Sequence, residues 1–278
     1  MEKTPILAIM YDFDHTLSPR DMQEYGFIPD LGMEADVFWN KCLKAMKRNQ
    51  MDQILAYMYM MLEEAKGKLI VNRNMLRALG KDVQLFDGVS DWFARVNEYA
   101  RSRGLQPEHY IISSGLKEII EGTPIAKEFK EIYAASFCYD EHGVACWPAM
   151  AVNYTSKTQF LFRVNKGVLD VTEHRALNEF MPEEKRRVPF SNMIYVGDGT
   201  TDIPCMRLVK NFGGHSIAVY NPDQKGARKE MASLIHDNRV NHVCPADYTE
   251  GSDMDLLVRT IIDKLDLDDR LDRLEVVK

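Results

Sequence analysis

The sequence contains no stretch that is long and apolar enough to cross a membrane. Its longest apolar runs, Ile6–Tyr11 and Ile54–Leu62, are far shorter than the roughly 20 residues that a membrane-spanning helix needs. The first residues, Met1–Pro5, lead straight into a strand-like segment and lack the pattern of a secretory signal. We therefore expect a cytoplasmic protein that has no membrane partner.

Cysteine is also scarce, and its spacing does not suggest paired sites. Only five cysteines occur in 278 residues, and no two of them are spaced as C-x-x-C. The odd number and this spacing argue against a disulfide framework and against a zinc site, and they favour reduced thiols. These cysteines are Cys42, Cys138, Cys146, Cys205 and Cys244.

An excess of positive charge is missing as well. The chain has 35 basic and 42 acidic side chains, which gives a formal net charge of −7. We expect no nucleic-acid partner, because binding to a phosphate backbone needs clustered positive charge. The 45% of hydrophobic residues provide enough material for a core, and the length suits one large domain or a core with a smaller insertion. The sequence does not indicate the oligomeric state.

Apolar runs that alternate with helical patterns are the main structural signal in the chain. The first run, Pro5–Tyr11, is continuous, which is typical of a parallel strand that is buried on both faces. Val89–Arg103 carries apolar residues at helical spacing. The alternation predicts an α/β fold with a Rossmann-like parallel sheet and helices on both faces. Further strands are predicted at His109–Ile112, Ala134–Tyr139, Met193–Val196 and Ser216–Tyr220.

One segment interrupts this alternation. Between the first two predicted strands the clearest patterns, Ala35–Lys47 and Met51–Glu64, are helical, and no convincing strand appears. We therefore predict a helical cap domain at residues 18–86, inserted into an α/β core domain made of residues 1–17 and 87–278. The methionine-rich second helix suits the apolar core of such a cap, and part of it is a candidate wall for a substrate pocket.

Polar residues follow the predicted strands at the points where the strands end. Asp12–Thr16 (D-F-D-H-T) follows the first strand, Ser113–Gly115 follows the second and Gly197–Asp202 follows a later one. In an open α/β sheet such loops meet at one edge, where ligands bind. Several carboxylates brought to one point repel each other unless a cation neutralises them. Carboxylate oxygens without a cluster of histidines or cysteines favour Mg²⁺.

Taken in order, these elements resemble the motifs of the haloacid dehalogenase superfamily. The D-x-D-x-T element is at Asp12–Thr16, and the serine that follows a hydrophobic strand is Ser113. The lysine that opens a helix is Lys157, and the G-D-x-x-x-D element is at Gly197–Asp202. A helical insertion after the first motif is similar to that of the phosphoserine phosphatase-like group. The resemblance implies a Mg²⁺-dependent phosphatase that acts on a small phosphomonoester.

The resemblance also implies two catalytic aspartates. Asp12 would attack phosphorus and form an aspartyl phosphate. Asp14 would protonate the leaving oxygen and then deprotonate the water that hydrolyses the intermediate. For this, the pKa of Asp14 must be above its ordinary value of roughly 3.9, which neighbouring carboxylates favour. His15, which follows Asp14, is interpreted as a spacer whose side chain leans toward the cap.

Other residues are expected to hold the phosphate and the metal. Backbone amides at a helix start are suited to binding phosphate, which is the role expected for Ser114 and Gly115. Asp202 would act on the metal through water or by orienting a lysine. The residues expected to bind phosphate are Ser113, Ser114, Gly115 and Lys157. Those expected to bind Mg²⁺ are Asp12, Asp14 through its backbone carbonyl, Asp198 and Asp202.

Several alternatives stay open at this point. A phosphomutase uses the same motifs, and a non-catalytic protein that binds metal or phosphate is a second alternative. A dehalogenase is disfavoured by the presence of Asp14, because that reaction has no leaving oxygen to protonate. Lys166 competes with Lys157, but it precedes Gly167 and suits the end of a helix. Asp21 is the cap residue that we consider first for contact with a substrate.

Overall fold

The computed structural model describes residues 4–199 and 201–275, so Thr200 of the G-D-x-x-x-D element lies outside the described residues. The described chain forms one seven-stranded sheet in the order β4-β3-β2-β1-β5-β6-β7. Strand β4 is antiparallel to β3, and the other neighbouring strands are parallel. The strands are β1 (Ile6–Tyr11), β2 (Gln106–Leu116), β3 (Phe129–Tyr139), β4 (Ala145–Met150), β5 (Met193–Gly197), β6 (His215–Tyr220) and β7 (His242–Pro245).

Strand β1 lies in the middle of the sheet, where the direction of strand addition reverses. The chain adds β2 and β3 on one side of β1, then returns to place β5, β6 and β7 on the other side. Tyr11, the last residue of β1, is in register with Ile111 of β2 and Val196 of β5. Because such a reversal opens a crevice at the carboxyl ends of the strands, the fold predicts a ligand site after Tyr11.

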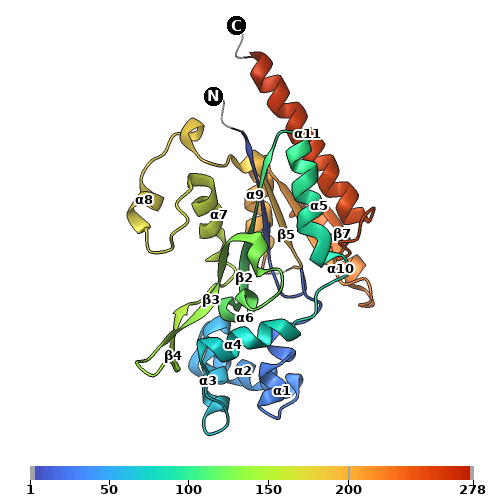
Figure 1. Cartoon of the computed structure of the whole chain (residues 1–278). Coiled ribbons are helices and arrows are strands. Elements are labelled where there is room, and N and C mark those ends of the chain that lie inside the picture. The colour runs from blue at the N-terminus through green and yellow to red at the C-terminus, as the bar shows by residue number, and fades with distance from the viewer. Residues whose placement is uncertain (1–3, 200, 276–278) are drawn as a thin grey trace.

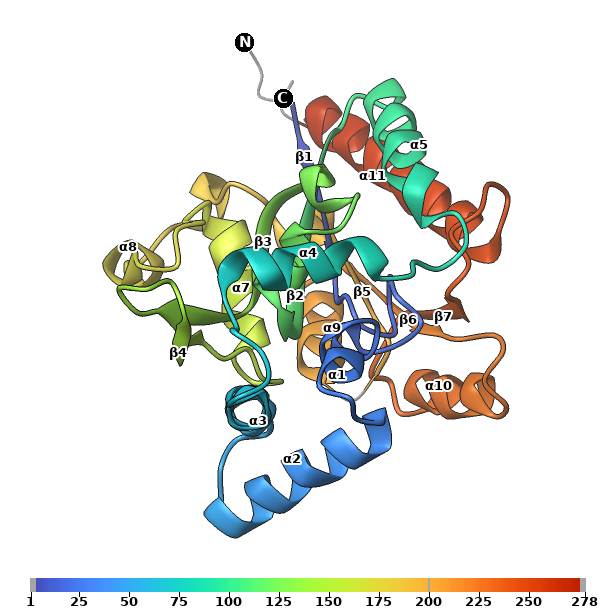
Figure 2. The ribbon, with the colours of Figure 1, turned by 60° about the horizontal axis from the view of Figure 1, so that its bottom comes forward.

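Helices cover both faces of the sheet, which confirms the predicted α/β architecture (Figure 1). Alternate residues of β1 belong to two separate apolar clusters: Leu7 and Ile9 to one, Ala8 and Met10 to the other. The first cluster includes α5 (Val89–Ser102) and α11 (Asp253–Glu275), which lie side by side (Figure 2). The second includes α7 (Lys157–Lys166), α9 (Ile203–Asn211) and α10 (Ala227–His236).

The segment between Leu17 and Phe86, which follows β1 and precedes α5, is mainly helical, as predicted. It lies beyond the carboxyl ends of the central strands, at the bottom of Figure 1. Helix α3 begins at a conventional cap, because the Asp52 carboxylate accepts the amide hydrogens of Ile54 and Leu55. The helices are α1 (Phe27–Asp30), α2 (Ala35–Asn49), α3 (Gln53–Ala65) and α4 (Arg73–Leu79), with 3-10 turns η1 (Met22–Glu24) and η2 (Gly80–Asp82).

The two ends of this helical segment lie together. The Phe86 amide donates to the Leu17 carbonyl at 2.9 Å. Helix α4 also packs closely on α6 (Lys117–Glu121), because a Cβ added to Gly122 would lie 1.8 Å from the Arg77 carbonyl oxygen. Almost all buried apolar side chains of the segment belong to the same cluster as Leu7, Ile9 and Tyr11 of β1. The segment is therefore firmly packed on the sheet.

Strands β3 and β4 form a hairpin at one edge of the sheet. Its turn contains the sequence D-E-H-G, and the Asp140 carboxylate accepts the amides of His142 and Val144, both at 2.9 Å. All five cysteines are free, and the Sγ atoms of Cys138 and Cys146 are 3.7 Å apart in this hairpin. The remaining short elements are η3 (Ala126–Glu128), α8 (His174–Asn178), η4 (Glu183–Lys185) and η5 (Phe190–Asn192). Within the described residues, no helix has the length and apolar character that crossing a bilayer requires.

Candidate active site

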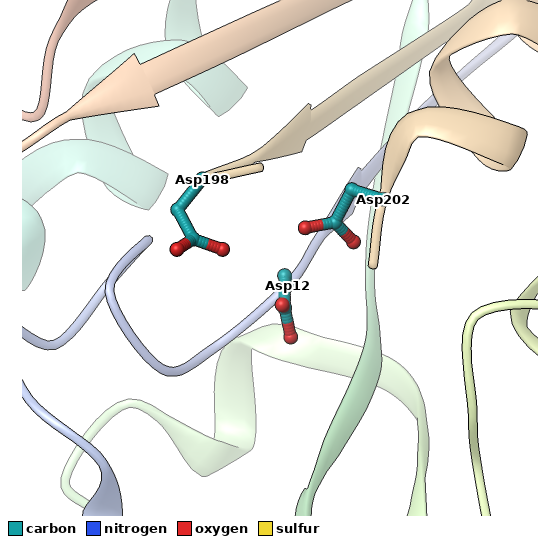
Figure 3. Close-up of side chains that lie close together, drawn as sticks. All are labelled: Asp12, Asp198 and Asp202. Atoms are coloured by element: carbon teal, nitrogen blue, oxygen red, sulfur yellow. The ribbon is translucent and has the colours of Figure 1, made fainter. Parts of the chain in front are cut away.

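Three carboxylates from distant parts of the sequence converge at the carboxyl edge of the sheet (Figure 3). Asp12 follows β1, Asp198 follows β5 and Asp202 directly precedes α9. One oxygen atom from each lies within 4.8 Å of the others. Asp202 is completely buried, and Asp12 is 5% exposed. The structure thus brings together three of the residues that the sequence predicts for one metal site.

Lys157 lies between two of these carboxylates. Its Nζ atom is 2.9 Å from Asp12 Oδ2 and 2.8 Å from Asp202 Oδ1, and the side chain is completely buried. Burial alone would lower the pKa of Lys157, but the two carboxylates raise it above its ordinary value, so the amine is charged. Lys166 lies at the other end of α7 and donates to backbone carbonyls instead. The choice between the two lysines therefore falls on Lys157.

The donor set fits a hard divalent cation. Burial, and then the neighbouring carboxylates, raise the pKa of Asp198 to about 8 and that of Asp202 to about 6. The Tyr195 hydroxyl and Lys157 both bind Asp202 Oδ1, at 2.6 and 2.8 Å, whereas the buried Oδ2 has no hydrogen-bond partner. An unpartnered buried oxygen among crowded carboxylates is the environment that a metal ion stabilises. All the candidate donors are oxygens, which suits Mg²⁺ better than a softer metal.

The side chain of Asp14 points away from this three-carboxylate cluster. Its Oδ1 accepts the Met22 amide at 2.9 Å, and a Cβ added to Gly115 would lie 2.8 Å from its Oδ2. Burial, then the negative charges of Asp21 and Asp12, raise the pKa of Asp14 well above its ordinary value. This is the direction that a general acid requires. Only the backbone of Asp14 is left for the metal role that the sequence analysis gave it.

The turn after Asp12 is held by short local hydrogen bonds. The Phe13 amide donates to Asp12 Oδ1 at 2.7 Å, and the Leu17 amide donates to the Phe13 carbonyl at 2.8 Å. His15 has a positive φ of 57°, which turns the chain toward the helical segment. Its Nε2 atom is 3.6 Å from Asp21 Oδ2. The side chain thus leans toward the predicted cap, as the sequence analysis expected.

The end of β2 provides a second polar wall, with one correction to the expected local structure. Ser113 is completely buried, and its Oγ accepts the Gly115 amide at 3.0 Å. We had expected Ser114 and Gly115 to lie at the start of a helix. Instead, β2 continues to Leu116 and α6 begins only at Lys117. Pairing with β3 through Leu116 keeps this backbone extended. The buried Oγ atom of Ser114 has no hydrogen-bond partner.

A cavity of about 440 Å³ lies between these polar loops and the helical segment. Its floor contains Asp12, Asp14, Ser113 and Asp198, and its walls come largely from η1, α2 and α3. The sequence analysis named Asp21 and part of the helix Met51–Glu64 for this wall, but it did not single out three polar side chains there. The Tyr57 hydroxyl, for example, donates to the Ser114 carbonyl at 2.8 Å across the cavity edge. The missed wall residues are Gln23, Gln53 and Tyr57.

Comparison with known protein families agrees with this site. Residues 9–207 match the family of haloacid dehalogenase-like hydrolases, and the matched range spans the Asp12, Ser113, Lys157 and Asp198 loops. The chain belongs to this family. An uncharacterized protein of Borreliella burgdorferi is 27% identical over 280 residues, which cover 90% of this chain and 94% of that protein.

Solved structures of this hydrolase family share the fold at low sequence identity. A HAD family hydrolase from Salmonella enterica serovar Typhi superposes with a TM-score of 0.57 at 15% identity, covering 93% of this chain and 72% of that one. A phospho-aspartyl intermediate analogue of phosphoserine phosphatase gives a TM-score of 0.53 at 13% identity, with coverage of 92% and 99%. At these identities the similarity establishes a common hydrolase fold.

Proposed function

We propose that this hydrolase is a Mg²⁺-dependent phosphatase that cleaves small phosphomonoesters through an aspartyl phosphate on Asp12. The observation that carries the proposal is the contrast between the two aspartates of one turn. Asp12 is bound to the charged amine of Lys157, whereas burial and negative charge favour the protonated form of Asp14. A carboxylate nucleophile beside a carboxylic acid is the pair that phosphoryl transfer through an aspartyl phosphate needs.

In the first step, an oxygen of Asp12 attacks phosphorus and the bond between phosphorus and the leaving oxygen breaks. The proton of Asp14 passes to that oxygen, so the alcohol leaves uncharged. In the second step, Asp14 takes a proton from a water molecule, whose oxygen attacks phosphorus and displaces Asp12. Inorganic phosphate is released, and both aspartates return to their initial states. The geometry of one turn thus serves both steps, because Asp14 is acid first and base second.

Groups around Asp12 are suited to hold the transferring phosphoryl group. Lys157 is positioned at Asp12 Oδ2, and the Ser113 and Ser114 hydroxyls lie at the end of the adjacent strand β2. Mg²⁺ bound by Asp12, Asp198 and the Asp14 carbonyl would neutralise charge on the phosphoryl oxygens, with Asp202 orienting Lys157. A related fold described as a phospho-aspartyl analogue of phosphoserine phosphatase supports the covalent intermediate.

The proposal also includes the division into two domains. We propose residues 18–86 as a cap over an α/β core of residues 1–17 and 87–278. The hydrogen bond between Phe86 and Leu17 at the two crossings, and the cavity between the helices and the motif loops, support this division. A cytoplasmic location and the lack of a nucleic-acid partner stay predictions from the sequence.

The test is release of inorganic phosphate from p-nitrophenyl phosphate and a panel of metabolite phosphomonoesters, with and without Mg²⁺. We expect turnover that requires Mg²⁺, and a loss of about 1,000-fold or more in Asp12→Asn, because removing a nucleophile disables the whole reaction. Asp91→Asn changes an exposed aspartate on α5 and serves as the matched control. A folded protein without turnover, or an Asp12→Asn variant as active as wild type, contradicts the proposal. Isomerisation that a bis-phosphorylated sugar activates would instead identify a phosphomutase.

A further inference from the structure

Four aspartates and one histidine are among the described residues that line the cavity. Asp14 and Asp21 face it beside the catalytic Asp12, and among its described lining residues there is no lysine or arginine. His15 is the one basic side chain in this wall, and it already lies 3.6 Å from Asp21. Lys157 is outside the lining, because its amine is held between Asp12 and Asp202. A carboxylate on the leaving group would therefore find no unpaired cation among these residues.

The opposite wall is apolar, with a few uncharged polar groups. Helix α2 contributes Trp39, Leu43 and Met46, and Ile54 comes from α3. Gln23 is almost completely buried, and its Oε1 atom has no hydrogen-bond partner. A buried unpartnered acceptor favours a ligand that brings a hydroxyl or an N–H group. The wall therefore matches an apolar body that carries at most an uncharged hydrogen-bond donor.

We propose that the cavity selects phosphomonoesters whose leaving alcohol is apolar and about the size of a ring, and rejects those that carry a carboxylate. The inference rests on the phosphatase function proposed above. The volume of about 440 Å³ falls within the ordinary range for small-molecule pockets, so a ring fits beside the phosphate. A bound carboxylate would lose its water shell, would find no unpaired cation among the described lining residues and would face the Asp21 carboxylate, which disfavours it. The chain is thereby distinguished from the phosphoserine phosphatases whose fold it shares, since phosphoserine bears a carboxylate.

The test compares benzyl phosphate with 4-carboxybenzyl phosphate, which differ only by the carboxylate, in the presence of Mg²⁺. We expect kcat/KM to be at least about tenfold higher for benzyl phosphate, because like charges brought together in a desolvated site oppose binding. Similar values for the two esters would overturn the inference and leave the phosphatase function standing. Hydrolysis of neither ester would overturn the proposed function itself, and the inference with it.

A positive charge added to the cavity wall tests whether the charge of this wall causes the selection. Leu43→Arg adds a cation to the cavity lining, and Val37→Arg adds the same cation to α2 outside the lining. Both positions accept a charged side chain readily, because Leu43 is 42% exposed and Val37 is 44% exposed. We expect Leu43→Arg to reduce the preference for benzyl phosphate several-fold and Val37→Arg to leave it unchanged. Equal ratios in the two variants would contradict selection by the charge of this wall.

Discussion

At the scale of single residues, the site is defined by an imbalance of charge. Lys157 supplies one positive charge against the carboxylates of Asp12, Asp198 and Asp202. Burial makes this imbalance costly, because charges removed from water are poorly screened. Without a bound cation, the cluster opposes folding. With one, the same residues contribute to stability.

This imbalance predicts that Mg²⁺ stabilises wild type more than it stabilises Asp198→Asn. In Mg²⁺-free buffer above pH 8, where Asp198 is ionised, Asp198→Asn should unfold at the same or a higher temperature than wild type, because a buried negative charge is lost. Saturating Mg²⁺ should stabilise wild type by about 3 kcal/mol at 100 times Kd, and Asp198→Asn by much less. Thermal unfolding followed by circular dichroism measures both effects. Equal shifts in the two proteins would mean that Asp198 does not bind the metal, and Asp91→Asn should behave as wild type.

Residues whose role is local could be predicted, and residues whose role depends on packing could not. Asp12 and Asp198 follow apolar runs directly, so their positions at strand ends are visible in the sequence. Gln23 and Tyr57 face the cavity only because of how η1 and α3 are placed, which no local pattern encodes. The helix start expected at Ser114 was wrong for a similar reason. Pairing between β2 and β3 is a contact between distant segments.

At the scale of elements, two close contacts fix the helical segment to the sheet. Tyr57 of α3 donates to the Ser114 carbonyl at the end of β2. Helices α4 and α6 meet through glycines: a Cβ at Gly80 would lie 2.2 Å from the Ile119 carbonyl oxygen, and Gly122 is equally confined. Neither glycine has room for a side chain. The segment is therefore held at the cavity from both sides.

The α4–α6 contact predicts a large effect from a single methyl group. Gly122→Ala should lower the free energy of unfolding by about 3 kcal/mol, because the added Cβ would collide with the Arg77 backbone, which cannot yield as a side chain can. Gly143→Ala is the control: its φ of 76° strains an alanine, but no atom lies within 4 Å, and we expect a loss of about 1 kcal/mol. Urea denaturation compares the two. Losses of the same size would show that α4 and α6 are not in close contact.

At the scale of the whole molecule, a buried polar chain crosses one face of the central sheet. The Trp92 indole donates to the Tyr11 hydroxyl at 2.9 Å, which lies 3.2 Å from His109 Nδ1, and His109 Nε2 is 3.0 Å from Asn97 Oδ1. These bonds suit a neutral imidazole that accepts at Nδ1 and donates at Nε2. Burial, and then Arg101, lower the pKa of His109 from 6.5 to about 3. Between these two pH values, His109 is therefore neutral in the folded protein and protonated in the unfolded chain.

Acid should therefore weaken the fold through this histidine. Above pH 6.5 both states are neutral at His109, so its contribution is constant. Between pH 6.5 and about 3 only the unfolded state takes up the proton, and stability falls as pH falls. Wild type should lose up to about 1.4 kcal/mol per pH unit more than His109→Gln in this range. Urea denaturation at several pH values measures the difference. The exposed His174→Gln should keep the wild-type slope, and an unchanged slope in His109→Gln would contradict the prediction.

The fold class could be predicted from the sequence, but the order of the strands in the sheet could not. Continuous apolar runs indicate strands covered on both faces, and the helical insertion between Leu17 and Phe86 interrupts them visibly. The sequence analysis did not assign the neighbours of each strand. That β5 lies beside β1 depends on pairing between Val196 and Tyr11, far apart along the chain. The cavity between helices and sheet depends on the same long-range packing.

The place of β1 between β2 and β5 also bears on when the site first exists. A chain emerging from the ribosome carries Asp12 early, but Asp198 and Asp202 only after more than half of its length has been made. Until β5 pairs with β1, Asp12, the nucleophile that we propose, lacks Asp198 beside it, and Lys157 lacks the hydrogen-bonded pair of Tyr195 and Asp202 that holds its amine. Turnover by this protein therefore requires that synthesis has passed β5 and that β5 has paired with β1.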